Sequence, residues 1–332
     1  MTPHLGLLAA CVYPRESIPT KLLTCFIFGR LHALRNDFAV ATHYVRKMPG
    51  SSQPILAEAS DGHQYVVKFA NNLIGPNLLF NESMGSELYR VFSLPVPRWE
   101  PILLTDSFID RHPGLWMESP NGRLRPTPGL CFGSRFLGER EKPIFEILPD
   151  VKFKRIRNRM SFWLAWVIDV CAEHVDNRQA IFFEYFEGWL EAVFFDHGHL
   201  FGGPKADTKK GCFASRYLDS RIYPRISSEE LLHIKEVLQA LDADMLWKRA
   251  EAIPREWRRK EAITAFENCL QRISHPRLVQ TVLDTINDAL KRETKRQQEY
   301  SAGGLEPSFA IQRSRVQSAG WGDSRASNSA CS

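Results

Sequence analysis

The chain has 332 residues, of which 44% are hydrophobic, 11% aromatic and 24% charged. This length and composition predict a folded protein with a large core. The formal net charge of +5 is spread over runs such as KFKRIRNR and KRETKR, which favours solvated helix faces over a nucleic-acid site. No apolar run approaches the roughly 20 residues that a membrane span needs, so we expect neither a specific nucleic-acid partner nor a membrane-spanning helix.

The cysteines and the two ends of the chain indicate a cytoplasmic protein. Seven cysteines occur at scattered positions without a CxxC pair, a pattern that favours reduced thiols over disulfides or a structural zinc site. Residues 1–30 are expected to form a loosely ordered leader, because LGLLAAC lacks the basic start and the length of a signal peptide. Residues 301–332 have few large apolar side chains, so we expect a disordered tail.

The first third of the chain predicts strands. AVATHYVRK (39–47) and PILAEAS (54–60) are expected to form strands, and HQYVVKFA (63–70) has a β-branched centre. Asp61 and Gly62 separate the last two segments and are typical of a tight hairpin turn. Further extended segments are expected at 98–105 and 128–138.

Helices are predicted mainly in the later part of the chain. Apolar residues recur every three or four positions in 77–94, which predicts an amphipathic helix that ends at LPVP. Residues 160–174 are apolar nearly all round, as in a buried helix, and 179–183 and 191–196 predict two short strands. Beyond residue 226 the pattern is helical, with a serine cap before EELLHIKEVL. Strands followed by helices predict an α+β fold of two lobes, a mostly antiparallel N-terminal lobe over 31–130 with one helix and a mostly helical C-terminal lobe over 131–300.

Two residues of the first lobe have the surroundings that a phosphoryl-transfer site needs. Lys68 lies in the middle of YVVKFANN, where a strand would direct its side chain to one face. Glu82 lies in the following helix and could pair with Lys68, which would hold the ammonium over nucleotide phosphates. Taken alone, each residue is more commonly explained as a charged side chain that faces water.

Two further segments carry carboxylates at positions suited to chemistry. In EHVDNRQAIFF, Asp176 could accept a proton from a hydroxyl nucleophile, and Gln179, or less favourably Asn177, could bind a metal ion. A helix-ending turn is the alternative explanation of this segment. In FFDHGHLFGG, Asp196 follows a buried strand and could bind Mg²⁺ through its carboxylate oxygens.

The order of these features, together with the residues that form them, resembles the HipA-like kinase domain family. The similar segments, which run from about residue 40 to 257, are GSSQPILAEASDGHQYVVKFANN, NES, LPVP, FGSRF, HVDNRQAIF and FFDHGHLFGGP. The resemblance implies a two-lobed protein-kinase-like fold and an ATP- and Mg²⁺-dependent kinase that phosphorylates a Ser or Thr hydroxyl of a protein, its own chain included. An antitoxin-like or regulatory partner is also implied, whereas the sequence does not identify the protein substrate.

The resemblance also implies a role for each matching residue. Lys68 would bind the ATP phosphates with Glu82 as its partner, Asp176 would be the catalytic base, and Asp196 would bind the metal. Gly50, Ser51 and Ser52 would form a short loop over the phosphates. The chain departs from the family at Ile181, which stands where an asparagine usually serves as second metal ligand, so Gln179 would have to take that role.

Two alternative functions stay open at this point. Ile181 favours a pseudokinase, a nucleotide-binding or scaffold module without phosphoryl transfer. A metal-dependent hydrolase could instead use a cluster of histidines and aspartates, formed by His174, Asp176, Asp196, His197 and His199. The hydrolase leaves Lys68 and Glu82 without a role.

Overall fold

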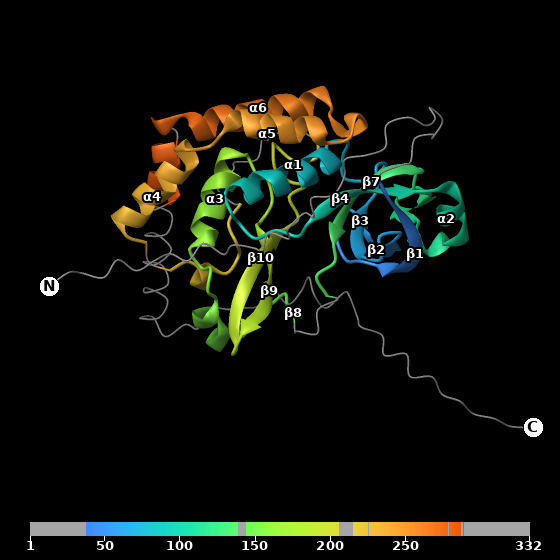
Figure 1. The fold of residues 1–332 in the computed structure, drawn as a ribbon, viewed down its shortest axis with the longest axis horizontal. Helices are drawn as coiled ribbons and strands as arrows, with labels where there is room; N and C mark the ends of the chain where they lie inside the picture. The colour runs from blue at the N-terminus through green and yellow to red at the C-terminus, as the bar shows by residue number, and fades with distance from the viewer. Residues whose placement is uncertain are drawn as a thin grey trace, which may run out of the picture. The chain divides into compact units, whose positions relative to one another are not determined.

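The computed structural model describes residues 38–138, 144–205, 215–224, 226–277, 279–286 and 288. These residues belong to one compact unit that begins at Phe38. They form a mixed α+β fold of strands first and helices later (Figure 1), as predicted. The expected leader (1–30) and tail (301–332) lie outside the described residues.

Five strands of the first part close into a barrel. Neighbours in the barrel are antiparallel, apart from the first and last strands, which run parallel. The barrel order is β1 (Ala39–Lys47), β2 (Ile55–Ala59), β3 (Gln64–Lys68), β7 (Gly129–Arg135) and β4 (Trp99–Leu104). The predicted turn between β2 and β3 forms at Gly62, whose φ of 80° lies in the left-handed region.

The connections between the barrel strands contain one expected helix, and an unexpected helix, 3-10 turn and hairpin. Helix α1 (Leu78–Val91) joins β3 to β4, and its first twelve residues, through Tyr89, are all buried. Helix α2 (Asp106–Arg111) starts at Thr105, whose hydroxyl accepts a hydrogen bond from the Phe108 amide. It is followed by the 3-10 turn η1 (Pro113–Leu115) and the hairpin of β5 (Met117–Ser119) and β6 (Gly122–Leu124).

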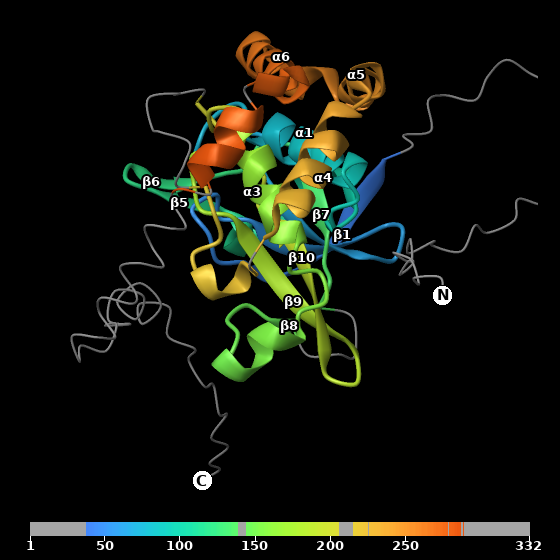
Figure 2. The ribbon, with the colours of Figure 1, turned by 90° about the vertical axis from the view of Figure 1, so that its left-hand side faces the viewer.

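A second sheet lies in the later part of the chain, as Figure 2 shows. Its order is β10 (Trp189–Phe195), β9 (Gln179–Phe186) and β8 (Ile144–Phe145), all antiparallel. Glu187 and Gly188 turn the chain between the two predicted strands β9 and β10 with φ of 46° and 78°.

Helices follow or flank this sheet. They are α3 (Ser161–Cys171), α4 (Ser228–Gln239), α5 (Ala243–Ala252) and α6 (Lys260–Ser274), with 3-10 turns η2 (Asp150–Arg155), η4 (Ser220–Ile222) and η5 (Arg255–Trp257). The predicted serine cap of α4 is present, because Ser227 and Glu230 bond reciprocally in a capping box.

The buried apolar residues form two clusters. One fills the barrel and includes Val67, Phe69 and Ile102. The other joins α1, α3, the β9–β10 hairpin and helices α4 to α6, so α1 packs on the helical part although it is inserted between barrel strands. The expected lobe boundary between residues 130 and 131 falls inside β7, and the division into two lobes stays a prediction.

Two further expectations can be compared with the described residues. The cysteines in those ranges, Cys131, Cys171 and Cys269, are buried and free of disulfides. Across the same ranges, no helix combines the length and apolar character required to cross a bilayer.

Candidate active site

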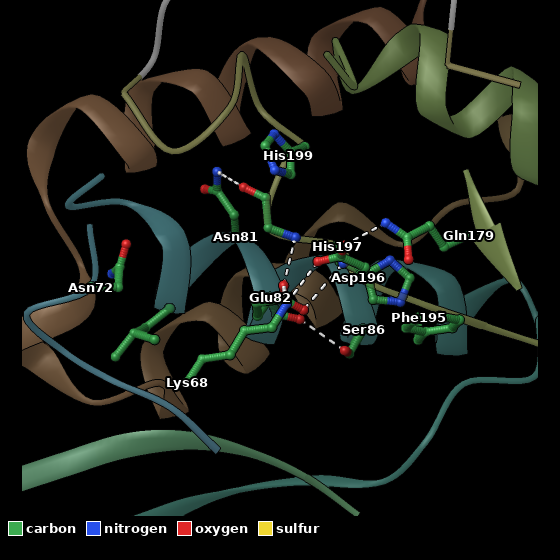
Figure 3. A network of polar contacts seen from close by, with 12 residues as sticks. Lys68, Asn72, Asn81, Glu82, Ser86, Gln179, Phe195, Asp196, His197 and His199 are labelled. Atoms are coloured by element: carbon green, nitrogen blue, oxygen red, sulfur yellow. Dashed lines mark hydrogen bonds and ion pairs between the residues drawn. The ribbon is translucent and has the colours of Figure 1, made fainter. Parts of the chain in front are cut away.

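Lys68 is the last residue of β3 and is the centre of a buried polar cluster (Figure 3). Its side chain is 11% exposed, and Nζ donates hydrogen bonds to Oε1 of Glu82 and, over 2.7 Å, to Oδ1 of Asp196. The three residues come from β3, α1 and the end of β10. The predicted Lys68–Glu82 pair is thus present, and Asp196 joins it.

Glu82 also binds the backbone that follows Asp196. Its carboxylate accepts hydrogen bonds from the amide of His197 over 3.1 Å and from the amide of Gly198 over 2.9 Å. A Cβ at Gly198 would lie 2.3 Å from a methyl carbon of Leu78 and 2.7 Å from Oε1 of Glu82. The glycine is therefore required by the close approach of this backbone to α1.

Asp196 stands at the point where β10 ends. Its φ is 59°, a left-handed conformation that costs energy in a residue with a side chain and is often found at functional sites. Phe195 pairs with Gln179 at the end of the β9–β10 ladder. Consequently Gln179 lies beside Asp196, and its Nε2 donates to Oδ2 of Asp196 over 2.7 Å.

One ammonium and two carboxylates share this buried space, so their charges are strongly linked. Burial raises the pKa of Glu82 to about 7, although the Lys68 ammonium opposes this change. Burial also disfavours the ionised form of Asp196, but the Lys68 charge and hydrogen bond outweigh it and hold the pKa of Asp196 well below its usual range. For Lys68, burial lowers the pKa, and the two carboxylates overcome this so that the pKa is raised. The ionised pair of Lys68 and Asp196 is therefore the stable state.

Asp176 lies in the turn between α3 and β9, close to the segment that follows Asp196. Its side chain is 45% exposed, and its Oδ2 lies 4.0 Å from Nε2 of His199. The Asn177 amide donates to Oδ1 of Asp176 over 2.7 Å, and the Val175 amide donates to the His199 carbonyl over 3.0 Å. The accessible carboxylate thus borders the same loop that carries Asp196.

The loop of Gly50, Ser51 and Ser52 lies at the end of the barrel where Lys68 is found. Ile55, at the start of β2, pairs with Val67, the neighbour of Lys68. Gly50 has a φ of 130°, which favours glycine. Gln53 fixes the loop, because its side-chain amide exchanges hydrogen bonds of 2.7 and 2.8 Å with the backbone of Glu118 in β5.

Ile181 and the histidines bear on the two alternative functions. Ile181 lies within β9, where it pairs with Val193, and its hydrocarbon side chain offers no metal ligand. His174 and His197 are both 1% exposed. Within the ranges that the structure describes, no three or more His, Cys, Asp or Glu side chains are arranged to hold a metal ion, so the hydrolase lacks the cluster on which it depended.

Several polar residues around the site were not predicted from the sequence. Asp169 is fully buried in the apolar helix α3 and binds Arg178 through two hydrogen bonds of 2.8 Å. Asn81 of α1 donates to the carbonyls of Gly198 and Leu200 over 3.0 and 2.8 Å. A single acidic residue within an otherwise apolar helix is a signal that could have pointed to Asp169, since buried charges require partners.

Comparison with known proteins gives only distant structural similarity. No protein-family model matches the sequence, and no curated protein matches it. The chain is similar in structure to the Helicobacter pylori proinflammatory kinase CtkA, with 10% identity over 73% of this chain and 94% of that one, at a TM-score of 0.44. It is also similar to the Golgi casein kinase with Mn/ADP bound, with 11% identity over 74% and 73% of the two chains and a TM-score of 0.44. A second structure of the Golgi casein kinase gives 12% identity over 74% and 72%, again at a TM-score of 0.44.

Proposed function

We propose that the chain is an ATP- and Mg²⁺-dependent kinase with a two-lobed, protein-kinase-like fold of the HipA-like type. The phosphoryl acceptor would be a Ser or Thr hydroxyl of a protein, with hydroxyls of this chain among the candidates. The observation that carries the proposal is the convergence of Lys68, Glu82 and Asp196 from three separate elements. A kinase needs this arrangement, in which a lysine fixed by a helix glutamate lies next to a metal-binding aspartate.

The donor set near Asp196 fits Mg²⁺. Asp196 presents two carboxylate oxygens. The side-chain amide of Gln179, whose nitrogen faces Asp196, also carries an oxygen that could bind the ion. Mg²⁺ prefers oxygen ligands and is commonly bound by one or two carboxylates together with substrate phosphates, so a protein-only cluster of three ligands is not required. When bound, the ion would neutralise charge on the phosphates.

Each remaining residue has a defined task in this proposal. Lys68 would transfer one of its hydrogen bonds from Asp196 to a phosphate oxygen, while Glu82 keeps its ammonium in place. The amides of the loop at Gly50, Ser51 and Ser52 would cover the phosphates. Asp176 would accept the proton of the Ser or Thr hydroxyl while the oxygen of that hydroxyl bonds to the γ-phosphorus. The bond between the γ-phosphorus and the bridging oxygen of the β-phosphate breaks at the same time, which releases ADP.

Phosphate transfer from labelled ATP tests this function. Wild type should label itself or an added protein in the presence of Mg²⁺, and Asp176→Ala and Asp196→Ala should each lose on the order of 100-fold or more in rate. Asp110→Ala provides a matched control, because Asp110 is an exposed aspartate paired with Arg125. Equal labelling by wild type and both site variants would contradict the assigned roles.

A pseudokinase is the second candidate, and Ile181 favours it. Such a protein would bind nucleotide at Lys68 and Asp196 without transferring phosphate. Wild type would then show a rise in melting temperature with ATP and Mg²⁺, since ligands that bind only the native state stabilise it, but no labelling of any protein. We retain a cytoplasmic location and an antitoxin-like or regulatory partner as proposals.

A further inference from the structure

Arg178 lies between Asp176 and Gln179 in the sequence and is 2% exposed. Its Nη1 donates to the carbonyl of Phe195 over 3.0 Å and lies 3.3 Å from Nδ1 of His197. Phe195 and His197 are the two neighbours of Asp196. One guanidinium group therefore contacts the chain on both sides of the proposed metal-binding residue.

The position of Arg178 is itself fixed by two helices. Nε and Nη2 each donate to a different oxygen of Asp169 over 2.8 Å, and Asp169 is 0% exposed. The Tyr89 hydroxyl donates to Oδ1 of Asp169 over 2.6 Å, and the guanidinium lies 4.9 Å from the centre of the Tyr89 ring. A bidentate pair of this kind restrains both the position and the plane of the arginine.

Tyr89 connects this pair to the helix that carries Glu82. The two residues are seven positions apart in α1, which is about two turns, so they lie on one face of the helix. The Tyr89 ring is also 4.6 Å from the ring of His197. Helix α1 thus contacts the backbone around Asp196 at two places, through the Glu82 carboxylate and through Tyr89 with Arg178.

We infer that Arg178, held by Asp169 and Tyr89, is a positioning residue that sets the orientation of the Asp196 carboxylate for metal binding. The inference deepens the proposed function and rests on it. Asp196 keeps a left-handed φ of 59°, and such a conformation persists only where its surroundings hold it in place. Partners behind a metal ligand commonly change metal affinity by about 10- to 100-fold when they are removed.

Titration of the nucleotide complex with Mg²⁺ tests the inference. Wild type and Arg178→Lys are compared by thermal shift at fixed ADP and increasing Mg²⁺, and the affinity for ADP without metal is measured in parallel. Arg178→Lys keeps a positive charge but loses the two-point contact with Asp169. We expect the Mg²⁺ concentration for half-maximal shift to rise about tenfold or more, while metal-free ADP binding changes less than about twofold. A general loss of packing would change both the Mg²⁺ dependence and the metal-free affinity for ADP, whereas a positioning role changes only the first.

Arg159→Lys is the matched control. Arg159 also donates to two backbone carbonyls, those of Ile222 and Arg221, over 3.0 and 2.6 Å, but it has no contact with Asp196 or its neighbours among the described bonds. This variant should keep the wild-type Mg²⁺ dependence. An equal change in Arg159→Lys and Arg178→Lys would overturn the inference, and so would a wild-type Mg²⁺ dependence in a folded Arg178→Lys.

A milder variant, Tyr89→Phe, tests the positioning role of Arg178 if Arg178→Lys does not fold. Tyr89→Phe keeps the ring and removes the hydroxyl, which donates to Asp169 over 2.6 Å and, over 3.4 Å, to the Ala165 carbonyl. We therefore expect a shift of about threefold in Mg²⁺ dependence in the same direction. No shift in Tyr89→Phe would then overturn the inference. Absence of Mg²⁺-dependent nucleotide binding in wild type would overturn the proposed function itself, whereas wild-type binding with unaffected variants would overturn only the role of Arg178.

Discussion

Gly85 of α1 and His197 are packed so closely that no side chain fits between them. A Cβ added at Gly85 would lie 2.5 Å from Cβ of His197 and 2.5 Å from a methyl carbon of Leu200. Glycine weakens a helix interior by about 1 kcal/mol relative to alanine. The close contact with His197 and Leu200 explains why position 85 is nevertheless a glycine. Helix α1 and the segment after Asp196 therefore depend on a glycine for their contact.

Gly85→Ala should destabilise the protein although alanine favours helix formation. The clash should cost about 1–3 kcal/mol of unfolding free energy, measured by urea denaturation. Gly114→Ala is the control, since its Cβ would lie 3.5 Å from the Tyr44 ring, an ordinary contact. A Gly85→Ala variant more stable than wild type would show that the segment around His197 moves freely.

Lys68→Met should destabilise the protein strongly, because it leaves the ionised Asp196 carboxylate, which is 24% exposed, without its cation. Removal of one member of a buried ion pair costs about 3–5 kcal/mol. The double variant Lys68→Met with Asp196→Asn removes the surplus charge, so it should be more stable than Lys68→Met alone. Urea denaturation of the four proteins of this cycle measures the coupling, and additive effects would contradict the shared network.

Removal of His174 should change the pH dependence of stability. Burial, together with the Arg178 guanidinium, holds the pKa of His174 well below its usual range. Below about pH 6.5 the unfolded chain therefore takes up a proton that the folded protein does not, and the unfolding free energy falls by about 1.4 kcal/mol per pH unit. His174→Met removes this contribution, so its advantage over wild type should grow as the pH decreases from 6.5 to 5.

The comparison of wild type with His174→Met isolates the contribution of His174 to the pH dependence of stability. Glu82, whose pKa is raised, acts in the opposite sense, since its protonated form stabilises the fold at low pH and this contribution is lost as the pH rises toward 7. Glu82 is present in both proteins and its effect cancels in the difference. Parallel stability curves from pH 5 to 7 would show that His174 titrates normally.

Glu87→Gln should loosen the attachment of α1 to its neighbours. The Glu87 carboxylate is 8% exposed and accepts hydrogen bonds from Arg90, from Arg249 of α5 and, over 2.8 Å, from Nε1 of Trp99 in β4. Loss of these charged hydrogen bonds should cost about 1.5–3 kcal/mol in urea denaturation. Glu100→Gln breaks only an exposed pair with Arg98 and should cost less than about 1 kcal/mol. Similar costs for the two variants would contradict an anchoring role for Glu87.

Local sequence patterns predicted the elements that depend on nearby residues. The turn at Asp61 and Gly62, helix α1 and the β9–β10 hairpin follow from turn chemistry and apolar spacing within short windows. The convergence of Lys68, Glu82 and Asp196 was anticipated through the order of motifs, and the structure brings them into contact.

Other features depend on contacts between distant residues and could not be read from local patterns. Closure of the barrel requires the parallel pairing of β1 with β4, which no pattern within either strand specifies. The bonds between Gln53 and Glu118 join a loop to a hairpin 65 positions away. The local sequence does not indicate the role of Arg178, because an arginine in a polar turn is ordinarily exposed, whereas here its pairing with Asp169 and its bond to the Phe195 carbonyl allow its burial.

A crystal structure with ADP and Mn²⁺ would show whether Asp196 binds the metal of a nucleotide complex, because manganese is located by its anomalous scattering. We expect an anomalous peak within about 2.0–2.4 Å of a carboxylate oxygen of Asp196, with Lys68 Nζ in hydrogen-bond contact with a phosphate oxygen. The peak should be absent from the same experiment on Asp196→Ala. A nucleotide bound away from Lys68, or a metal ion without contact to Asp196, would contradict the assignment of this site.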